Sequence, residues 1–420
     1  MKTSLPTLAI LCGLLPVSFS ALAQDWSITT MPEAFWSGVA CSADGMKLVL
    51  DGYGSGIWVS TNRGATWDEK NTISSNRWSA VASSADGMKL VAVSQDLYGS
   101  IYMSTNSGNT WQPAAAPTDN YHAVASSPDG TKLAAVSWDS GAYGIYTSSN
   151  SGASWGLTAA VPLIGSFQSV AISADGTKLA AAGGGLSLIG ATTTLTGGGE
   201  IEYSTNSGVT WHLSDASMNW EWSAIACSSN GNFMVAAAYG DTNNNPGPVL
   251  ISTNAGANWM PTTAPNLAYG AVACSADGTR ITVGCYNAYQ TISPNVVYSS
   301  TNSGATWVPD QTLTDAGSIA YSADGTKRVA TTAGGWLVPN YVAVSPLLAV
   351  TAGPQLIIMP SGNTVALYWP TSASGYILQS TTNLSAGSWS SITNGISTIG
   401  SYYAFTNAAS GKAAFFRLKQ

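Results

Sequence analysis

The chain has 420 residues, of which 8% are charged, and its formal net charge at pH 7 is −7. This length allows a sizeable core or more than one domain, and the composition lacks the clustered Lys and Arg that nucleic-acid binding requires. Ser, Thr, Asn and Gly supply most of the polar surface instead.

Residues 1–23 are predicted to be a secretory signal peptide. Lys2 provides the positive charge, residues 8–15 form a short apolar run, and residues 21–23 (Ala-Leu-Ala) offer a cleavage site. No later stretch is long and apolar enough to span a bilayer. We therefore expect a mature chain that is secreted or periplasmic and has no membrane span.

Two short phrases alternate along residues 24–346. The first has eight residues, begins with Ser, ends with Trp, and occurs six times, at 60–67, 104–111, 148–155, 204–211, 252–259 and 300–307. The second carries an Asp-Gly or Asn-Gly pair, with its glycine at Gly45, Gly87, Gly130, Gly176, Gly231, Gly278 and Gly325. A repeat of roughly 45 residues with two turn signals per unit is typical of a β-propeller blade.

The first unit shows how one blade is expected to form. Residues 37–42, 47–50 and 56–60 are predicted strands, and a fourth strand follows the eight-residue phrase. The Asp44-Gly45 pair predicts a type I′ hairpin turn, because glycine accepts positive φ. In the eight-residue phrase, Asn62 is expected to bond to nearby backbone, Gly64 to be left-handed, and Trp67 to cover the turn. Four short antiparallel strands make one blade.

The eight-residue phrase resembles the Asp-box, or BNR repeat, of sialidases and of photosystem-assembly-factor-like and sortilin-like propellers. Asparagine replaces the usual aspartate in every copy. Six boxes that alternate with seven Asp-Gly or Asn-Gly turns predict an all-β, seven-bladed β-propeller. The seventh unit lacks a box, and residues 25–28 look like the strand that follows one. The N-terminal strand is therefore predicted to close the last blade and to cover its open edge.

Beyond the repeats, residues 347–354 are predicted to be a linker and residues 355–420 a small C-terminal β-sandwich. Its predicted strands are 356–359, 365–369, 377–380, 402–405 and 415–418. The Trp369-Pro370 pair, Leu-Gln-Ser-Thr at 378–381 and Phe-Phe-Arg-Leu at 415–418 resemble C-terminal modules of secreted bacterial proteins.

Four cysteines remain after the predicted cleavage, which in a secreted chain suggests disulfides. Three of them, Cys41, Cys227 and Cys274, share one column of the repeat, and this column holds Ser, Ile or Tyr in the other units. A position that accepts such residues is a packing position, so we expect buried free thiols.

In sialidases and related Asp-box enzymes the binding site lies on the face away from the boxes, and the resemblance implies the same face here. Just before the first strand, six of seven units carry an aromatic residue: Trp36, Trp78, Tyr121, Phe167, Trp222 and Tyr269. These rings are candidates for stacking on sugars or contacting a protein. The alternative is that they wedge between neighbouring blades.

Acidic residues beside aromatic ones follow several second strands on the same face: Asp51, Asp96, Asp139 and Asp241. They are either ligand-binding carboxylates or ordinary turn residues with solvated side chains. The longest insertion, residues 183–199, is either a specificity loop or a surface excursion. A basic residue follows most hairpin turns and is expected to be a solvated strand end: Lys47, Lys89, Lys132, Lys178, Arg280 and Lys327.

Sialidase chemistry is not predicted, because only Arg77 of the five arginines falls on the predicted site face and the Phe/Tyr-Arg-Ile-Pro motif is absent. No catalytic residue, cofactor or metal site is predicted, since no Cys/His cluster has ligand spacing. We expect a monomeric, non-catalytic propeller that binds a polysaccharide or an extracellular protein. The alternative is a glycoside hydrolase or lyase that uses two carboxylates across a groove on that face.

Overall fold

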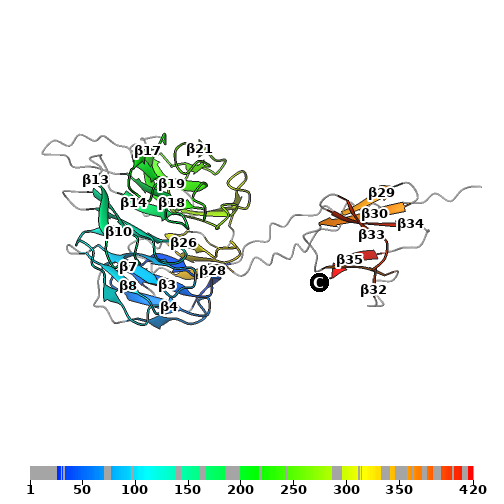
Figure 1. The fold of residues 1–420 in the computed structure, drawn as a ribbon, viewed down its shortest axis with the longest axis horizontal. Helices are drawn as coiled ribbons and strands as arrows, with labels where there is room; N and C mark the ends of the chain where they lie inside the picture. The colour runs from blue at the N-terminus through cyan, green and yellow to red at the C-terminus, as the bar shows by residue number, and fades with distance from the viewer. Residues whose placement is uncertain are drawn as a thin grey trace, which may run out of the picture. The chain divides into compact units, whose positions relative to one another are not determined.

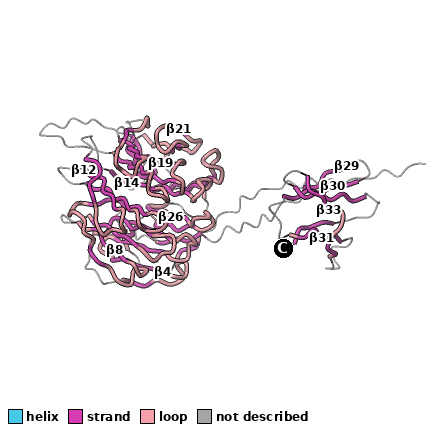
Figure 2. Tube along the Cα trace, viewed as in Figure 1, coloured by secondary structure: helices cyan, strands magenta, loops and turns pink. Residues whose placement is uncertain are grey.

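The computed structural model describes residues 26–29, 31, 34–70, 77–95, 99–138, 143–160, 167–184, 199–216, 220–241, 245–285, 296–310, 313, 315–332, 341–345, 357–361, 364–370, 376–381, 389–399, 402–408 and 415–419. They belong to two compact units, Met1–Leu347 and Leu348–Gln420. Figure 2 shows strands and loops without a helix in these ranges, so none of the described residues form a helix that could cross a membrane.

The described part of the first unit contains seven four-stranded antiparallel sheets, which we call blades 1 to 7. Blade 1 comprises β2 (Trp36–Cys41), β3 (Leu48–Gly52), β4 (Gly56–Ser60) and β5 (Asp68–Glu69). Blade 2 comprises β6 (Trp78–Ser83), β7 (Leu90–Ser94), β8 (Ile101–Ser104) and β9 (Gln112–Pro113). Blade 3 comprises β10 (Tyr121–Ser126), β11 (Leu133–Trp138), β12 (Tyr143–Ser148) and β13 (Gly156–Ala160).

The remaining blades repeat this order. Blade 4 comprises β14 (Phe167–Ile172), β15 (Leu179–Gly183), β16 (Glu200–Ser204) and β17 (His212–Leu213). Blade 5 comprises β18 (Trp220–Cys227), β19 (Met234–Asp241), β20 (Val249–Ser252) and β21 (Met260–Pro261). Blade 6 comprises β22 (Tyr269–Cys274), β23 (Ile281–Cys285), β24 (Val297–Ser300) and β25 (Val308–Pro309). Blade 7 comprises β26 (Ser318–Tyr321), β27 (Arg328–Thr331), β28 (Val342–Ser345) and β1 (Ser27–Ile28).

The blades form a closed ring. The first strand of each blade lies beside the first strand of the next, and β26 of blade 7 lies beside β2 of blade 1 (Figure 1). The second strands are buried on both faces, as in β3 and β7, because each sheet packs between two neighbours. This arrangement is a β-propeller with the first strands innermost.

The N-terminal strand closes the last blade, as the sequence predicted. Strand β1 pairs antiparallel with β28, with Ser27 opposite Val344 and Ile28 opposite Ala343. Blade 7 thus takes three strands from the end of the repeat and its outermost strand from the beginning of the described chain. The edge of β28, which would otherwise be open, is paired.

A buried ion pair supports this closure. Arg328 Nη2 lies 3.6 Å from Asp310 Oδ2, and both side chains are only 1% exposed. The indole nitrogen of Trp26 donates to the same Oδ2 at 2.7 Å, and the guanidinium of Arg328 lies 4.5 Å from the Trp26 ring centroid. Arg328 also donates to the hydroxyls of Thr282 and Ser299 on blade 6. One cluster therefore joins blade 6, blade 7 and the N-terminal strand.

The Asp-Gly hairpins do not use the predicted type I′ turn. That turn needs positive φ at both central residues, whereas only the glycine, such as Gly45 at φ 65°, is left-handed in these hairpins. Gly45 N donates to the Ser42 carbonyl, so Ala43 and Asp44 are the central residues and the glycine follows them, as in a type I turn. The Asp44 carboxylate accepts bonds from Ser42 Oγ and the Met46 amide, and these lower its pKa.

Each box is held by one serine and one asparagine. In the first copy, Ser60 Oγ accepts from the Gly64 amide, and Asn62 Oδ1 accepts from the Thr66 amide while Nδ2 donates to Thr66 Oγ1. The predicted left-handed glycine is present, and the preceding residue, Arg63 in this copy, is left-handed as well. In three copies the tryptophan also bonds to the turn: the Nε1 atoms of Trp211, Trp259 and Trp307 donate to the carbonyls of Gly208, Gly256 and Gly304 at 2.9–3.1 Å, whereas those of Trp67, Trp111 and Trp155 do not.

The hairpin turns connect neighbouring blades on the box face. The amide of Ala43 donates to the Ala85 carbonyl, Ala85 to Pro128, and Ala323 of blade 7 back to Ala43. Pro128 has no N–H, and accordingly no bond from it to blade 4 is found among the described residues. Lys47 Nζ reaches the Asp86 carbonyl of blade 2, so this lysine is not the solvated strand end that the sequence predicted. Lys89, Lys178 and Lys327 make equivalent bonds.

The described residues of the C-terminal unit form two sheets around a small core. One sheet has the order β29 (Ile357–Ser361), β30 (Thr364–Pro370), β34 (Tyr402–Ala408), β33 (Ile396–Ile399). The other has the order β32 (Ser390–Ser391), β31 (Ile377–Thr381), β35 (Phe415–Lys419). Leu367 and Trp369 of the first sheet pack with Leu378 of the second, as in a sandwich.

Candidate functional site

The six aromatic residues that precede the first strands are buried. The most exposed of them, Phe167, exposes 6% of its surface, and Tyr121 and Tyr269 expose none. Three of the rings meet a ring on the third strand of their own blade edge to face, with centroids 5.4–6.1 Å apart: Trp36 with Trp58, Trp78 with Tyr102, and Tyr121 with Tyr146. Their burial favours the alternative that they wedge between blades. Ligand contact by this column stays a prediction.

The four candidate carboxylates do not form one described site. Asp96 and Asp139 lie outside the described residues. Asp51 belongs to blade 1 and Asp241 to blade 5, which are not neighbours. Both lie within strands, β3 and β19, rather than in the loops where the sequence placed them, because each second strand extends to or beyond its acidic residue. Asp241 accepts two bonds from Asn245, both at 2.8 Å, and so holds its own loop.

Asp51 is fully buried between blades 1 and 2. Its Oδ2 accepts from Ser37 Oγ at 2.9 Å, and its Oδ1 fills the space left by Gly38, where a Cβ would lie 2.3 Å away. Burial raises the pKa of this carboxyl to about 7, against hydrogen bonds from Ser37 and nearby backbone that favour the charged form. A group with these contacts does not reach a ligand directly.

Five residues on the face away from the boxes join blades 1, 2 and 3. We call them the blade 1–3 strip: Phe35, Tyr53 and Arg77, which are exposed, and Gln95 and His122, which are half-buried. Phe35 is 48% exposed and Tyr53 44%. The Tyr53 amide donates to the Phe35 carbonyl at 2.8 Å, and the Arg77 guanidinium lies 4.8 Å from the Tyr53 ring centroid, with Nε donating to the phenol oxygen.

The strip continues from blade 2 to blade 3. The Gln95 amide donates to the Arg77 carbonyl at 2.9 Å, and its side-chain nitrogen lies 3.1 Å from His122 Nδ1. Burial lowers the pKa of His122, so its imidazole is neutral at neutral pH. The strip therefore offers two aromatic surfaces, one cation, one amide and one neutral imidazole, and it contains no carboxylate. Of these five residues, Arg77 and Tyr53, the aromatic neighbour of Asp51, were predicted on this face from the sequence, whereas Phe35, Gln95 and His122 were not.

A second group of acidic residues on blades 4 and 5 was not predicted. Glu202 is 3% exposed and occupies the third-strand position that holds Trp58, Tyr102 and Tyr146 in blades 1 to 3. Burial raises its pKa to about 7, and the nearby charge of Glu200 adds to the shift. Burial also raises the pKa of Glu200 and of Glu221. Glu202 could have been found in the sequence, because it replaces the aromatic residue that blades 1 to 3 carry at the same position.

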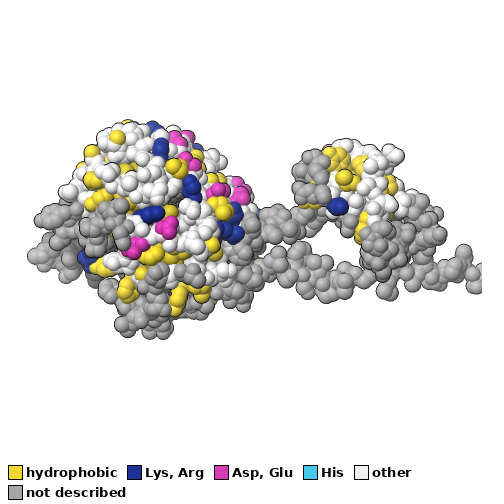
Figure 3. Space-filling model, turned by 90° about the horizontal axis from the view of Figure 1, so that it is seen from below, with side chains coloured by type: hydrophobic (Ala, Val, Ile, Leu, Met, Phe, Trp, Pro, Cys, Tyr) yellow, Lys and Arg dark blue, Asp and Glu magenta, His cyan; other side chains and the backbone are white. Residues whose placement is uncertain are grey.

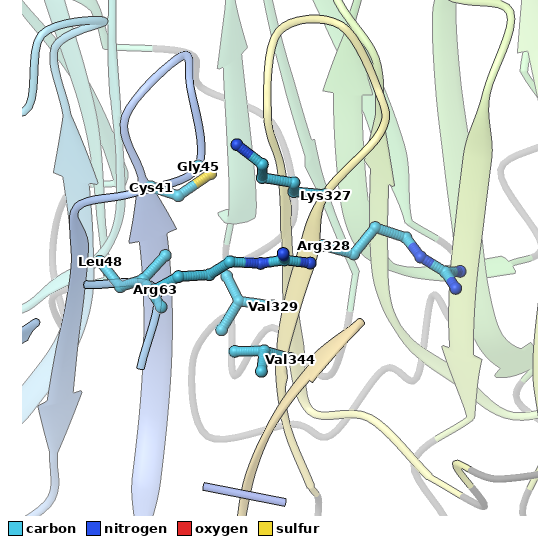
Figure 4. A pocket seen from close by; sticks show the side chains of 8 residues that line it. All are labelled: Cys41, Gly45, Leu48, Arg63, Lys327, Arg328, Val329 and Val344. Atoms are coloured by element: carbon cyan, nitrogen blue, oxygen red, sulfur yellow. The ribbon is translucent and has the colours of Figure 1, made fainter. Parts of the chain in front are cut away.

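The crevice between blades 7 and 1 is not a ligand site. It is lined by Cys41, Gly45, Leu48, Arg63, Lys327, Arg328, Val329 and Val344. Figure 4 shows Arg63 reaching across it toward β27, whereas the Arg328 side chain points away from it. Cys41 is a free thiol that donates to the Tyr321 carbonyl, and burial raises its pKa to about 12. These contacts are those of a packed seam.

The charged side chains of the described residues do not by themselves indicate a ligand site. On the face shown in Figure 3, basic and acidic side chains are few and interspersed among polar and hydrophobic ones. Cys227, Cys274 and Cys285 are free thiols like Cys41. No group of three or more His, Cys, Asp or Glu in the described ranges is placed to hold a metal ion.

Comparisons with known proteins support the fold. No protein-family model matches the chain, and no curated protein matches it. Among solved structures, the GH74 enzyme of Niastella koreensis has 16% identity and a TM-score of 0.57, covering 82% of this chain and 59% of its own length. YCF48 of Cyanidioschyzon merolae has 14% identity and a TM-score of 0.54, covering 76% of this chain and 98% of its own. Hydrazine synthase of Kuenenia stuttgartiensis has 16% identity, covers 77% of this chain and 98% of its own, and has a TM-score of 0.57.

These identities establish similarity of fold rather than of function. The chain also spans only 59% of the length of the GH74 enzyme. Together with the seven four-stranded sheets in the described residues, the comparisons show that the first unit is a β-propeller.

Proposed function

We propose that this chain is a secreted, non-catalytic β-propeller of the Asp-box type that binds a polysaccharide through the blade 1–3 strip. The supporting observation is the strip itself, a row of linked aromatic, cationic, amide and imidazole groups on the face away from the boxes. Aromatic rings present apolar faces to sugar rings, and the amide and imidazole supply hydrogen bonds to hydroxyl groups.

The buried aromatic column supports the same proposal indirectly. Because Trp36 and Trp78 pack inside the ring, they hold the loops before the first strands in place, including the backbone of Phe35 and Arg77. The propeller then acts as a rigid frame, and the residues just outside its repeated positions carry the ligand contacts. A solved YCF48 structure is bound to a peptide, so an extracellular protein partner is the second outcome to test.

Tyr53→Ala is predicted to weaken polysaccharide binding at least about tenfold, because truncating an anchoring aromatic residue commonly costs about 2 kcal/mol. The measurement is a panel of immobilised neutral and acidic polysaccharides, followed by affinity measurement on those retained. The matched control is Met88→Ala, which alters a 40%-exposed apolar residue on the box face and should leave binding unchanged. Equal affinities for Tyr53→Ala and the parent would refute the strip as the site.

The alternative, a glycoside hydrolase, is favoured by the acidic group of Glu200, Glu202 and Glu221. A carboxyl whose pKa is raised to about 7, as in Glu202, has the property of a general acid. The solved GH74 xyloglucanase of Xanthomonas campestris shows that this fold also carries hydrolytic enzymes. Glu202 is buried, however, which leaves non-catalytic binding as the better-supported function.

A further inference from the structure

Asp51 stands out from its column of the repeat. At the equivalent place on the second strand, the other six blades carry Val93, Val136, Ala182, Ala237, Gly284 or Thr331. Only blade 1 places a carboxyl group there, and it is fully buried. A buried charge is unfavourable unless it is compensated, so this carboxyl needs an explanation beyond packing.

The Ser37 hydroxyl has two hydrogen-bond acceptors within reach but only one proton to donate. Ser37 Oγ lies 2.9 Å from Asp51 Oδ2 and 3.0 Å from the carbonyl oxygen of Trp78 on blade 2. A charged Asp51 and a carbonyl are both acceptors, whereas a serine has one hydroxyl proton. If Asp51 is charged, it competes with Trp78 for that proton. If Asp51 is protonated, its own O–H donates to Ser37, and the serine proton is left for the Trp78 carbonyl.

At two other boundaries between neighbouring blades, the equivalent serine donates to the equivalent main-chain carbonyl, and its second acceptor is not a carboxylate. Ser79 Oγ lies 2.7 Å from the Tyr121 carbonyl of blade 3, and Ser223 Oγ lies 2.7 Å from the Tyr269 carbonyl of blade 6. Their second acceptors are main-chain carbonyls, at Val93 and Ala237. The corresponding distance is longer at Ser37, the one of these three serines that faces a carboxyl group.

We propose that Asp51 is a positioning residue for the blade 1–3 strip: when it takes up a proton, Ser37 is free to bond the Trp78 carbonyl and to fix blade 2 against blade 1. Trp78 follows Arg77 directly, and Arg77 contacts Tyr53, two residues after Asp51. Tyr53 and Arg77 therefore lie on opposite sides of the blade 1–blade 2 boundary that the Ser37–Trp78 bond holds together. The link to ligand binding rests on the proposed function, whereas the link to the seam does not.

The groups that face Asp51 do not titrate. They are Ser37 and Gly38 on β2, Ile57 on β4, and Trp78 and Ala80 on β6. The titratable residues near the seam, Tyr53 and Arg77, contact each other at the surface. Burial raises the pKa of this carboxyl to about 7, and the hydrogen bonds from Ser37 and from nearby backbone oppose that rise.

The direction of the pH effect follows from this raised pKa. In the unfolded chain the carboxyl titrates near its ordinary value of 3.8, whereas in the folded chain it holds its proton to about pH 7. The stabilising effect of protonated Asp51 is therefore complete below the unfolded value and is lost as the pH rises toward 7. The Ser37–Trp78 bond weakens over the upper part of the same range.

The test compares the mature full chain with Asp51→Asn, which offers Ser37 an amide donor at every pH, and Asp51→Val, which restores the residue of blades 2 and 3. The ¹³C shift of the Asp51 carboxyl is followed against pH, and unfolding free energy is measured from about pH 4 to about pH 8. Glu202→Gln serves as control, because it removes the other buried carboxyl with a pKa of about 7. The rate of amide hydrogen exchange in residues 77–80 is compared with that around Tyr269, which makes the equivalent bond between blades 5 and 6 and serves as the reference seam.

We expect the carboxyl to titrate near pH 7. The part of the stability loss that belongs to Asp51 should be missing in both Asp51 variants and present in Glu202→Gln, whereas the part that accompanies the titration of Glu202 should remain in the Asp51 variants. At high pH, amide exchange in residues 77–80 should rise above that of the reference seam in the parent and in Glu202→Gln, and in neither Asp51 variant. A carboxyl that titrates near 3.8, or an unchanged pH step in Asp51→Asn, would overturn the proposal. If the parent protein bound no polysaccharide at any pH while Asp51 still titrated near pH 7, only the proposed function would be refuted and the role of Asp51 at the seam would stand.

Discussion

Asp310→Ala is expected to destabilise the propeller by about 3–5 kcal/mol, because it removes one partner of a buried ion pair. Arg328 would keep its hydroxyl contacts to Thr282 and Ser299 and lose the only carboxylate that the described residues place beside it. Trp26 would lose its acceptor in the same change. Urea denaturation of the mature protein measures the loss as a lower midpoint.

The double variant Asp310→Ala/Arg328→Leu separates the charge from the packing. Four other blades carry leucine at the position of Arg328: Leu48, Leu90, Leu133 and Leu179. An apolar residue of this kind should need no counter-charge, so the double variant should recover most of the stability lost by the single one. A double variant as unstable as Asp310→Ala would show that the ion pair does not explain the loss.

Trp26→Ala is expected to cost about 3–5 kcal/mol, the usual range for deleting a buried tryptophan side chain. Its ring packs with Leu313 and Ala316 and against the Arg328 guanidinium, so the change also loosens the ion pair. The measurement is again the free energy of unfolding. Removing residues 26–29 altogether should have at least this effect, since it also opens the edge of β28.

The control lies on the same strand. Ile28 is 66% exposed, and Ile28→Ala should change stability by no more than about 0.5 kcal/mol. If Trp26→Ala unfolded at the temperature of the parent, the N-terminal strand would not be what closes the ring.

The repeat predicted the blades because each turn signal repeats a local requirement. Gly45 must accept positive φ, and Ser60 and Asn62 must bond to the backbone of the box. Such local rules do not depend on the rest of the fold, so they can be recognised in the sequence. The closing N-terminal strand could be predicted for a similar reason, because residues 25–28 resemble the strand that follows a box.

The site was harder to predict because burial is decided by neighbouring blades. Trp36 and Trp78 were predicted either to contact a ligand or to wedge between blades, and the sequence alone could not decide; both are buried. Asp51 was predicted to follow the second strand, but it pairs with Gly38 on one side and Ile57 on the other and so lies within β3. Lys47 looked solvated, but its Nζ reaches the next hairpin. Repeated residues built the frame, whereas Phe35 and Arg77, one position before the repeated aromatic residues, form the exposed strip.

The most direct test of non-catalytic binding is to measure the release of reducing ends from the polysaccharide that the mature protein retains best. The Glu202→Gln and Asp51→Asn variants are measured alongside. We predict retention of the polysaccharide with no release above that of a protein-free sample. Release by the parent that either variant abolishes while still folded would contradict that prediction and establish a glycan-cleaving enzyme.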